Sequence, residues 1–196
     1  MTAFDPRPLL ATAMDQAGSL IAAVKPEQAH LPTPCDDYDV NRLIGHMQAV
    51  VRRIGVVLSG EPFWSVPREM ETTDWVADWA AGRAATDAVL ADDECLTREV
   101  TVPWGTVPGA SAAASYIGEL SVHAWDLAMA IGTPEVLNAG LATAALPAYM
   151  EKVPAEPRGP EIPFGPVVEV GPDADPYEKL VAWTGRDPRW AAPAEY

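Results

Sequence analysis

PGASAAASYIGELSVHAWDLAMAIG, the stretch from Pro108 to Gly132, has the start and stop signals of one helix. Proline is common where a helix begins, and glycine is common just after its last residue. Within this stretch, Glu119 and His123 are four residues apart, so they lie about 40° apart around the helix and one turn along the same face. A carboxylate and an imidazole so arranged can bind one metal ion, and the stretch therefore predicts a helix with a candidate metal-binding face.

Other parts of the chain also show helical periodicity and helix punctuation. Helices are predicted over residues 6–24, 40–60, 73–90 and 133–152. The segment REVTVPWGTV, residues 98–107, alternates weakly and predicts a short strand or hairpin. Long helices with short connections favour an antiparallel four-helix bundle, with the strand or hairpin just before its fourth helix. The predicted fold class is therefore mainly α.

The composition changes near the C-terminal end, where half of the 20 prolines fall from Pro147 onward. Proline interrupts helices, so this segment cannot be helical throughout. Residues 175–178, Asp-Pro-Tyr-Glu, offer an N-cap and a capping box, and Gly185 offers a C-cap. We therefore expect residues 1–152 to form a metal-binding bundle. Residues 153–196 are expected to form a proline-rich tail with one short helix, packed on the bundle within the same domain.

Length and charge exclude several classes of function. The chain has 196 residues, close to one domain of about 150. It has 28 acidic and 13 basic side chains and a net charge of −15, which argues against binding nucleic acid or anionic lipid. There is no apolar run of about 18 residues, no signal-peptide pattern, and only two cysteines. We expect a soluble cytoplasmic protein, either a monomer or a homodimer.

The chain has three histidines, and one of them extends the candidate metal site. His46 lies on the apolar stripe of the helix predicted at 40–60, so its side chain is expected to point into the bundle. A buried histidine needs a polar partner. Two histidines and one glutamate form a ligand set seen in catalytic zinc sites, which keep a fourth position open. Asp126, one turn after His123, can accept a hydrogen bond from a ligand imidazole. Two alternatives remain open. Glu119 and His123 can be a solvent-exposed pair on the helix surface, and His46 can be an ordinary core histidine with a polar partner.

Other candidate residues carry weaker signals. Trp104, in the segment predicted to be a hairpin, is expected near a pocket mouth, and Tyr116 lies on the helical stripe of Glu119; both are candidate substrate contacts. Cys35 is followed by two aspartates, whose negative charge should raise the pKa of its thiol, so it is expected to be structural. His30, bracketed by prolines, is expected to be exposed.

Three parts of the sequence resemble one family. TPCDDYDVNRLIGH at residues 33–46 is similar to the opening signature of the DinB-like metal-binding bundles. ELSVHAWDLAMAIG at residues 119–132 is similar to the second signature of the branch typified by mycothiol-dependent maleylpyruvate isomerase. Residues 164–170 and 185–188 resemble the tail of its short, single-domain actinobacterial members.

The resemblance implies a site and a cofactor. His46, Glu119 and His123 match the three metal ligands of the family. The implied ion is divalent, most often zinc, with nickel reported among relatives, and the implied thiol co-substrate is mycothiol. The two-domain isomerases have a further C-terminal domain that this chain is too short to contain, so maleylpyruvate is not implied as the substrate.

The expected activity is a thiol-dependent S-transfer or isomerisation on a small electrophile. A metal-bound thiol is deprotonated, whereas a free thiol is only a few per cent thiolate at neutral pH. One alternative is a hydrolase that uses metal-bound water, with Asp126 as the general base. Another is a non-catalytic bundle that binds a metal or a small molecule.

Overall fold

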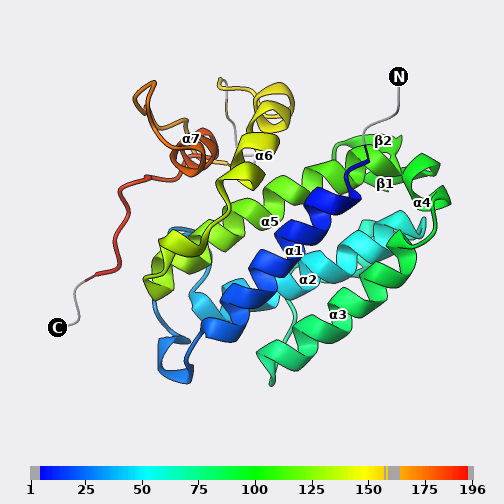
Figure 1. Ribbon diagram of the computed structural model, residues 1–196, viewed down its shortest axis with the longest axis horizontal. Helices are drawn as coiled ribbons and strands as arrows, with labels where there is room; N and C mark the ends of the chain where they lie inside the picture. Colours follow the sequence, from blue (N-terminus) through cyan, green and yellow to red (C-terminus); the bar gives the residue numbers. More distant parts are fainter. Residues whose placement is uncertain (1–4, 157, 159–163, 194–196) are drawn as a thin grey trace.

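Four long helices lie side by side in the computed structural model, which describes residues 5–156, 158 and 164–193 (Figure 1). They are α1 (Arg7–Ala23), α2 (Val40–Leu58), α3 (Trp75–Leu90) and α5 (Gly109–Ile131). Their facing sides enclose one continuous apolar core, in which Leu43, Ile54 and Leu120 are almost completely buried. The mainly helical fold predicted from the sequence is confirmed.

The direction of α3 differs from the simple antiparallel bundle that was predicted. A Cβ at Gly82 would meet Val51, and one at Gly55 would meet Thr86, so residue numbers rise together along α2 and α3 and the two helices are parallel. The reason is the connection at residues 59–74, which is long enough to return along α2 before α3 begins. We call this segment the crossover. A hydrogen bond from the Met70 amide to the Gly45 carbonyl, at 3.0 Å, holds the returning part of the crossover against α2.

The predicted strand region is a hairpin. β1 (Glu99–Val102) pairs antiparallel with β2 (Gly105–Pro108), and it follows a short helix, α4 (Glu94–Thr97). α5 starts directly after β2 and ends at Gly132, whose φ of 76° is the left-handed conformation typical of a helix C-cap. The helix that carries Glu119 and His123 therefore has both predicted ends.

Two further helices cover one side of α5. α6 (Ala139–Lys152) and α7 (Pro176–Trp183) lie together next to α5 (Figure 1). They bury a second apolar cluster against Val122 and Trp125. α6 begins six residues later than predicted, because Asn138 caps it by accepting a hydrogen bond from the Gly140 amide at 2.9 Å. The capping box predicted at the start of α7 is present. Parts of the predicted tail, residues 157, 159–163 and 194–196, lie outside the described residues.

Single turns of 3-10 helix occupy some of the connections. They are η1 (Pro26–Gln28), η2 (Phe63–Ser65) and η3 (Pro134–Val136). Among the residues that the structure describes, no helix has the length and apolar character needed to cross a membrane.

Candidate metal centre

Three side chains from two helices meet in the bundle. His46 of α2 and His123 of α5 direct their Nε2 atoms at the same Glu119 carboxylate oxygen, at 3.3 and 3.7 Å. One ligand atom from each residue lies within 4.8 Å of the other two. Ligands bound at about 2.0–2.1 Å to a tetrahedral zinc ion are separated from each other by about 3.4 Å. The structure therefore brings together the three residues predicted as metal ligands, at a spacing that fits one ion. We call them the His-Glu-His cluster.

Both imidazoles are held from behind, and this fixes which nitrogen faces the cluster. His46 Nδ1 donates to the Arg68 main-chain carbonyl at 2.8 Å. His123 Nδ1 donates to the Asp126 carboxylate at 2.9 Å. With the proton of each neutral ring on Nδ1, the Nε2 lone pairs point at Glu119, as metal-ligating histidines require. The tautomers are assigned from these partners.

The charges in the cluster also suit a cation. Burial disfavours the charged form of His123, but hydrogen bonds to Asp126 and Glu119 raise its pKa to about 9. Burial alone would raise the pKa of Glu119, but the two histidines hold it well below its usual value. Without a metal, a proton on His123 thus occupies part of the space between the nitrogens and the carboxylate. A divalent ion at these atoms would place its positive charge where that proton lies, so the donor set fits a divalent metal.

The cluster is buried on its histidine sides and open at the glutamate. The His46 and His123 side chains are 9% and 10% exposed, whereas Glu119 is 32% exposed. A ligand from solvent would therefore approach past the Glu119 carboxylate.

Asp126 is completely buried and is part of a larger hydrogen-bond network. Arg186, just after α7, donates to both of its carboxylate oxygens, at 2.6 and 2.8 Å. Burial would raise the pKa of Asp126, but the charge of Arg186 and the hydrogen bond from His123 keep it below its usual value. Asp126 therefore stays ionised, and it links His123 to the C-terminal part of the chain.

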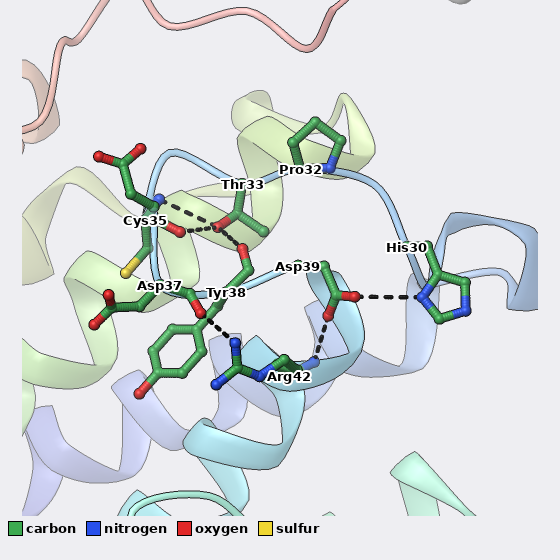
Figure 2. Close-up of a pocket in the computed structure, with 9 residues that line it drawn as sticks. His30, Pro32, Thr33, Cys35, Asp37, Tyr38, Asp39 and Arg42 are labelled. Carbon is green, nitrogen blue, oxygen red and sulfur yellow. Dashed lines mark hydrogen bonds and ion pairs between the residues drawn. The ribbon is translucent and has the colours of Figure 1, made fainter.

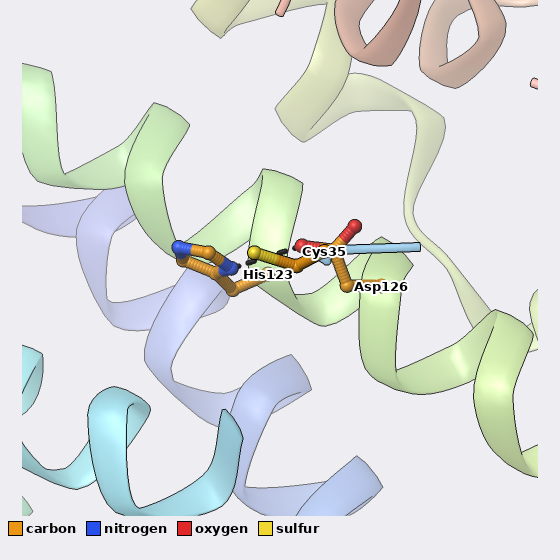
Figure 3. A group of neighbouring side chains, drawn as sticks. All are labelled: Cys35, His123 and Asp126. Atoms are coloured by element: carbon orange, nitrogen blue, oxygen red, sulfur yellow. Dashed lines mark hydrogen bonds and ion pairs between the residues drawn. The ribbon is translucent and has the colours of Figure 1, made fainter. Parts of the chain in front are cut away.

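Cys35 lies beside His123 and Asp126 (Figure 3). Its sulfur, a His123 nitrogen and an Asp126 oxygen form a second group within 4.8 Å. The Arg186 guanidinium already pairs with that carboxylate, so a cation there would meet a positive charge. The predicted rise in the pKa of the thiol is confirmed, although its main causes are burial and the charge of Asp126 rather than the aspartates that follow Cys35.

The loop before α2 positions Tyr38 against the cluster. Figure 2 shows this loop lining a cavity of about 460 Å³, which none of the His-Glu-His residues lines. Thr33 accepts from the Cys35 amide at 3.1 Å and donates to the Tyr38 carbonyl at 2.8 Å, so the loop is closed on itself. The Tyr38 ring then stacks on His46, with ring centroids 5.1 Å apart. Its hydroxyl accepts from Arg68 at 2.8 Å, which ties this loop to the crossover.

The remaining predicted residues fall in different places. Tyr116 is buried one turn before Glu119. Trp104 lies at the tip of the hairpin and is 53% exposed. The ten residues of helix between Gly109 and Glu119 span about 15 Å, so the structure does not bring Trp104 to the cluster. His30 is exposed, as expected, and faces Asp39.

Three residues around the cluster had no predicted role: Tyr38, Arg68 and Arg186. Tyr38 and Arg186 lie within the segments that carry the family resemblance, which is the one signal that could have drawn attention to them. Arg68 contacts His46 through its main-chain carbonyl, which no side-chain pattern predicts.

Comparison with known proteins gives three findings. A family model described as the mycothiol maleylpyruvate isomerase N-terminal domain matches residues 10–128. Two uncharacterized proteins of Mycobacterium tuberculosis are each 29% identical over 184 residues, 93% of this chain and 99% of the relative. A crystal structure of a histidine-to-alanine mutant of the mycothiol-dependent maleylpyruvate isomerase has a TM-score of 0.61 at 15% identity, covering 74% of this chain and 66% of that one. This last likeness is one of fold.

Proposed function

The chain belongs to the family of mycothiol maleylpyruvate isomerase N-terminal domains, and from this premise we propose that it is a metal-dependent transferase or isomerase that uses a small thiol of the mycothiol type. The observation that carries the proposal is the convergence of His46, Glu119 and His123, with both Nδ1 atoms already hydrogen-bonded behind them. We assign zinc as the metal, with nickel as the alternative. The second substrate is a small electrophile.

A divalent ion bound at the cluster would act as a Lewis acid and lower the pKa of a coordinated thiol. The protein contributes two neutral imidazoles and one carboxylate, which together with a divalent ion leave one positive charge. That charge favours an anionic sulfur in a chain whose net charge is −15. Since Glu119 is the exposed member, the thiol and the electrophile would both enter on its side.

The structure favours this activity over the alternative hydrolase, in which Asp126 is the general base. Both Asp126 oxygens accept hydrogen bonds from Arg186, and one also accepts from His123. Its lowered pKa makes it a weak proton acceptor. Asp126 is therefore better suited to orient His123 than to activate a water molecule.

Thiol binding with and without metal tests the proposal. Elemental analysis of the purified protein identifies the ion, which a chelator then removes. We expect calorimetric titration with mycothiol to give clearly tighter binding to the zinc-loaded protein than to the metal-free protein. Equal binding would contradict the proposal. Activity towards ester or amide substrates that does not depend on added thiol would favour the hydrolase instead.

The crossover gives a second prediction, at Gly45. A Cβ at this position would lie 2.5 Å from the Met70 carbonyl oxygen, so Gly45→Ala must push the crossover away from α2. The Arg68 carbonyl would then leave His46 Nδ1, and loss of such a contact typically weakens metal binding about 10- to 100-fold. We expect that loss in a zinc competition titration. The matched control is Gly171→Ala, where a Cβ would have nothing within 4 Å, and which should bind zinc like the unaltered protein.

A further inference from the structure

Arg53 of α2 is a half-buried cation that has no acidic partner in the part of the chain that the structure describes. Its Nη2 donates to the Pro67 carbonyl at 2.7 Å and is 3.5 Å from the Val66 carbonyl. Its Nε is buried and has no hydrogen-bond partner among residues 5–156, 158 and 164–193. Among the described residues, no carboxylate forms a salt bridge with it, although acidic side chains outnumber basic ones 28 to 13. By contrast, Arg42 and Arg68 nearby each pair with a carboxylate.

The position of Arg53 places its charge beside the His-Glu-His cluster. It follows His46 by seven residues, so the two lie on the same face of α2, about 10 Å apart along the helix axis. Helical side chains point back toward the N-terminus of their helix, which for Arg53 is the direction of His46. Arg53 reaches the Pro67 carbonyl, and the next carbonyl along the crossover, that of Arg68, is the one that binds His46.

Tyr116 supplies a second donor at the same place. It lies one turn before Glu119 on α5, and its ring is buried. α5 runs antiparallel to α2, because a Cβ at Gly109 would meet Leu58, whereas Glu119 meets His46. Residue numbers fall from Glu119 to Tyr116 in the same direction along the bundle in which they rise from His46 to Arg53, so Tyr116 and Arg53 lie on the same side of the cluster. Burial raises the pKa of Tyr116 and keeps its phenol protonated. At neutral pH it is therefore an O–H donor next to a guanidinium. Two donors with one positive charge are suited to a planar anion such as a carboxylate.

We propose that Arg53 and Tyr116 form an anion-binding subsite beside the His-Glu-His cluster, which holds a carboxylate group of the substrate while sulfur is held at the cluster. The sulfur half of this statement rests on the proposed function. The carboxylate can belong to the thiol itself or to the electrophile, and the probes below distinguish these two sources.

Small thiols of matched size provide the probes. Zinc-loaded protein is titrated calorimetrically with mercaptopropanoate and its longer homologues, and with the corresponding mercaptoalcohols. A charged hydrogen bond of this kind is worth about 10- to 100-fold in affinity, so the best carboxylate probe should bind that much more tightly than its alcohol. Butyrate is then added with mercaptopropanol present. Simultaneous binding of the two assigns the carboxylate to the electrophile, and mutual exclusion assigns it to the thiol.

Variants of two neighbouring arginines test which residue gives the preference. Arg53→Gln is expected to abolish it, whereas Arg53→Lys, which keeps the charge, retains part of it. The matched control is Arg52→Gln, because the Arg52 guanidinium donates to the main-chain carbonyls of Gln48 and Asp78; this variant should keep the full preference. Tyr116→Phe should reduce it about 3- to 10-fold, and it serves as the test if Arg53→Gln does not fold.

The outcomes separate this subsite from the proposed function. Equal affinity for acid and alcohol probes in the unaltered protein, or an undiminished preference in Arg53→Gln, would overturn the subsite while thiol binding stands. If no thiol binds at all, the proposed function fails, and the subsite is judged with butyrate alone. In that case butyrate must shift the Arg53 Nε–H resonance in nuclear magnetic resonance spectra, and the absence of a shift overturns the subsite.

Discussion

His123→Ala is expected to give a folded protein that no longer retains divalent metal and has lost its thiol-dependent activity. The substitution removes one of three ligand atoms, and it also removes the group through which Asp126 acts on the site. Loss of a residue that only orients a ligand already weakens metal binding about 10- to 100-fold, so loss of the ligand itself should cost at least about 100-fold. Elemental analysis after dialysis and a zinc competition titration measure the effect.

His30→Ala is the matched control for this experiment. His30 is exposed and lies on the loop before α2, so its removal should change neither the metal content nor the activity. If His123→Ala binds zinc as tightly as the unaltered protein, the assignment of the cluster is wrong. If metal is lost but turnover persists, the ion has only a structural role. If neither the unaltered protein nor the variant turns over any thiol-dependent substrate, the bundle is a binding protein.

Arg186→Leu is expected to cause the largest loss of stability. It leaves the completely buried Asp126 carboxylate without its cationic partner. Breaking a buried ion pair by removing one member typically lowers the free energy of unfolding by about 3–5 kcal/mol. That is a large part of the about 5–15 kcal/mol that stabilises an ordinary domain. Urea denaturation, followed by circular dichroism, should show a clearly lower midpoint.

Two further variants test whether the loss of stability is specific to the Asp126–Arg186 pair. Arg189→Leu removes an arginine three residues further on, whose side chain is 86% exposed, and it should leave the midpoint unchanged. The double variant Asp126→Leu with Arg186→Leu removes both charges, and it should recover much of the stability because neither charge is left buried and unpaired. A midpoint in Arg186→Leu that equals that of the unaltered protein would show that the pair contributes little to folding.

Helical periodicity predicted part of the cluster. The pattern around His46 and the spacing of Glu119 and His123 place these side chains on inward faces of their helices, but periodicity does not fix the level at which the two helices meet, and the family resemblance was needed to join the three residues in one site. The ends of α5 were equally predictable, since proline and glycine act on the backbone locally. Asp126 followed from the same spacing, one turn beyond His123.

The contacts that complete the site could not be predicted in this way. Arg186 is 60 residues from Asp126 in the sequence, in a segment without periodicity, so nothing local indicates that they meet. The parallel direction of α3 depends on the course of the crossover. The length of the crossover is the only feature of its sequence that indicates how it packs on α2. Trp104 was placed near a pocket by its neighbourhood in the sequence alone. Its role as a substrate contact stays a prediction, and among the described residues its exposed side chain lies away from the cluster.

The two histidines of the cluster are supported by chemically different acceptors, and this has a consequence for how the sequence can drift. His46 is oriented by a backbone oxygen, which every amino acid at position 68 would supply, so this hydrogen bond survives replacement of Arg68 in relatives even where the contact of its side chain with Tyr38 is lost. His123 relies on a carboxylate that must itself be neutralised, so a change at Asp126 must be accompanied by one at Arg186. Across relatives, tolerance at the first position and paired substitution at the other two would be the evolutionary trace of this asymmetry.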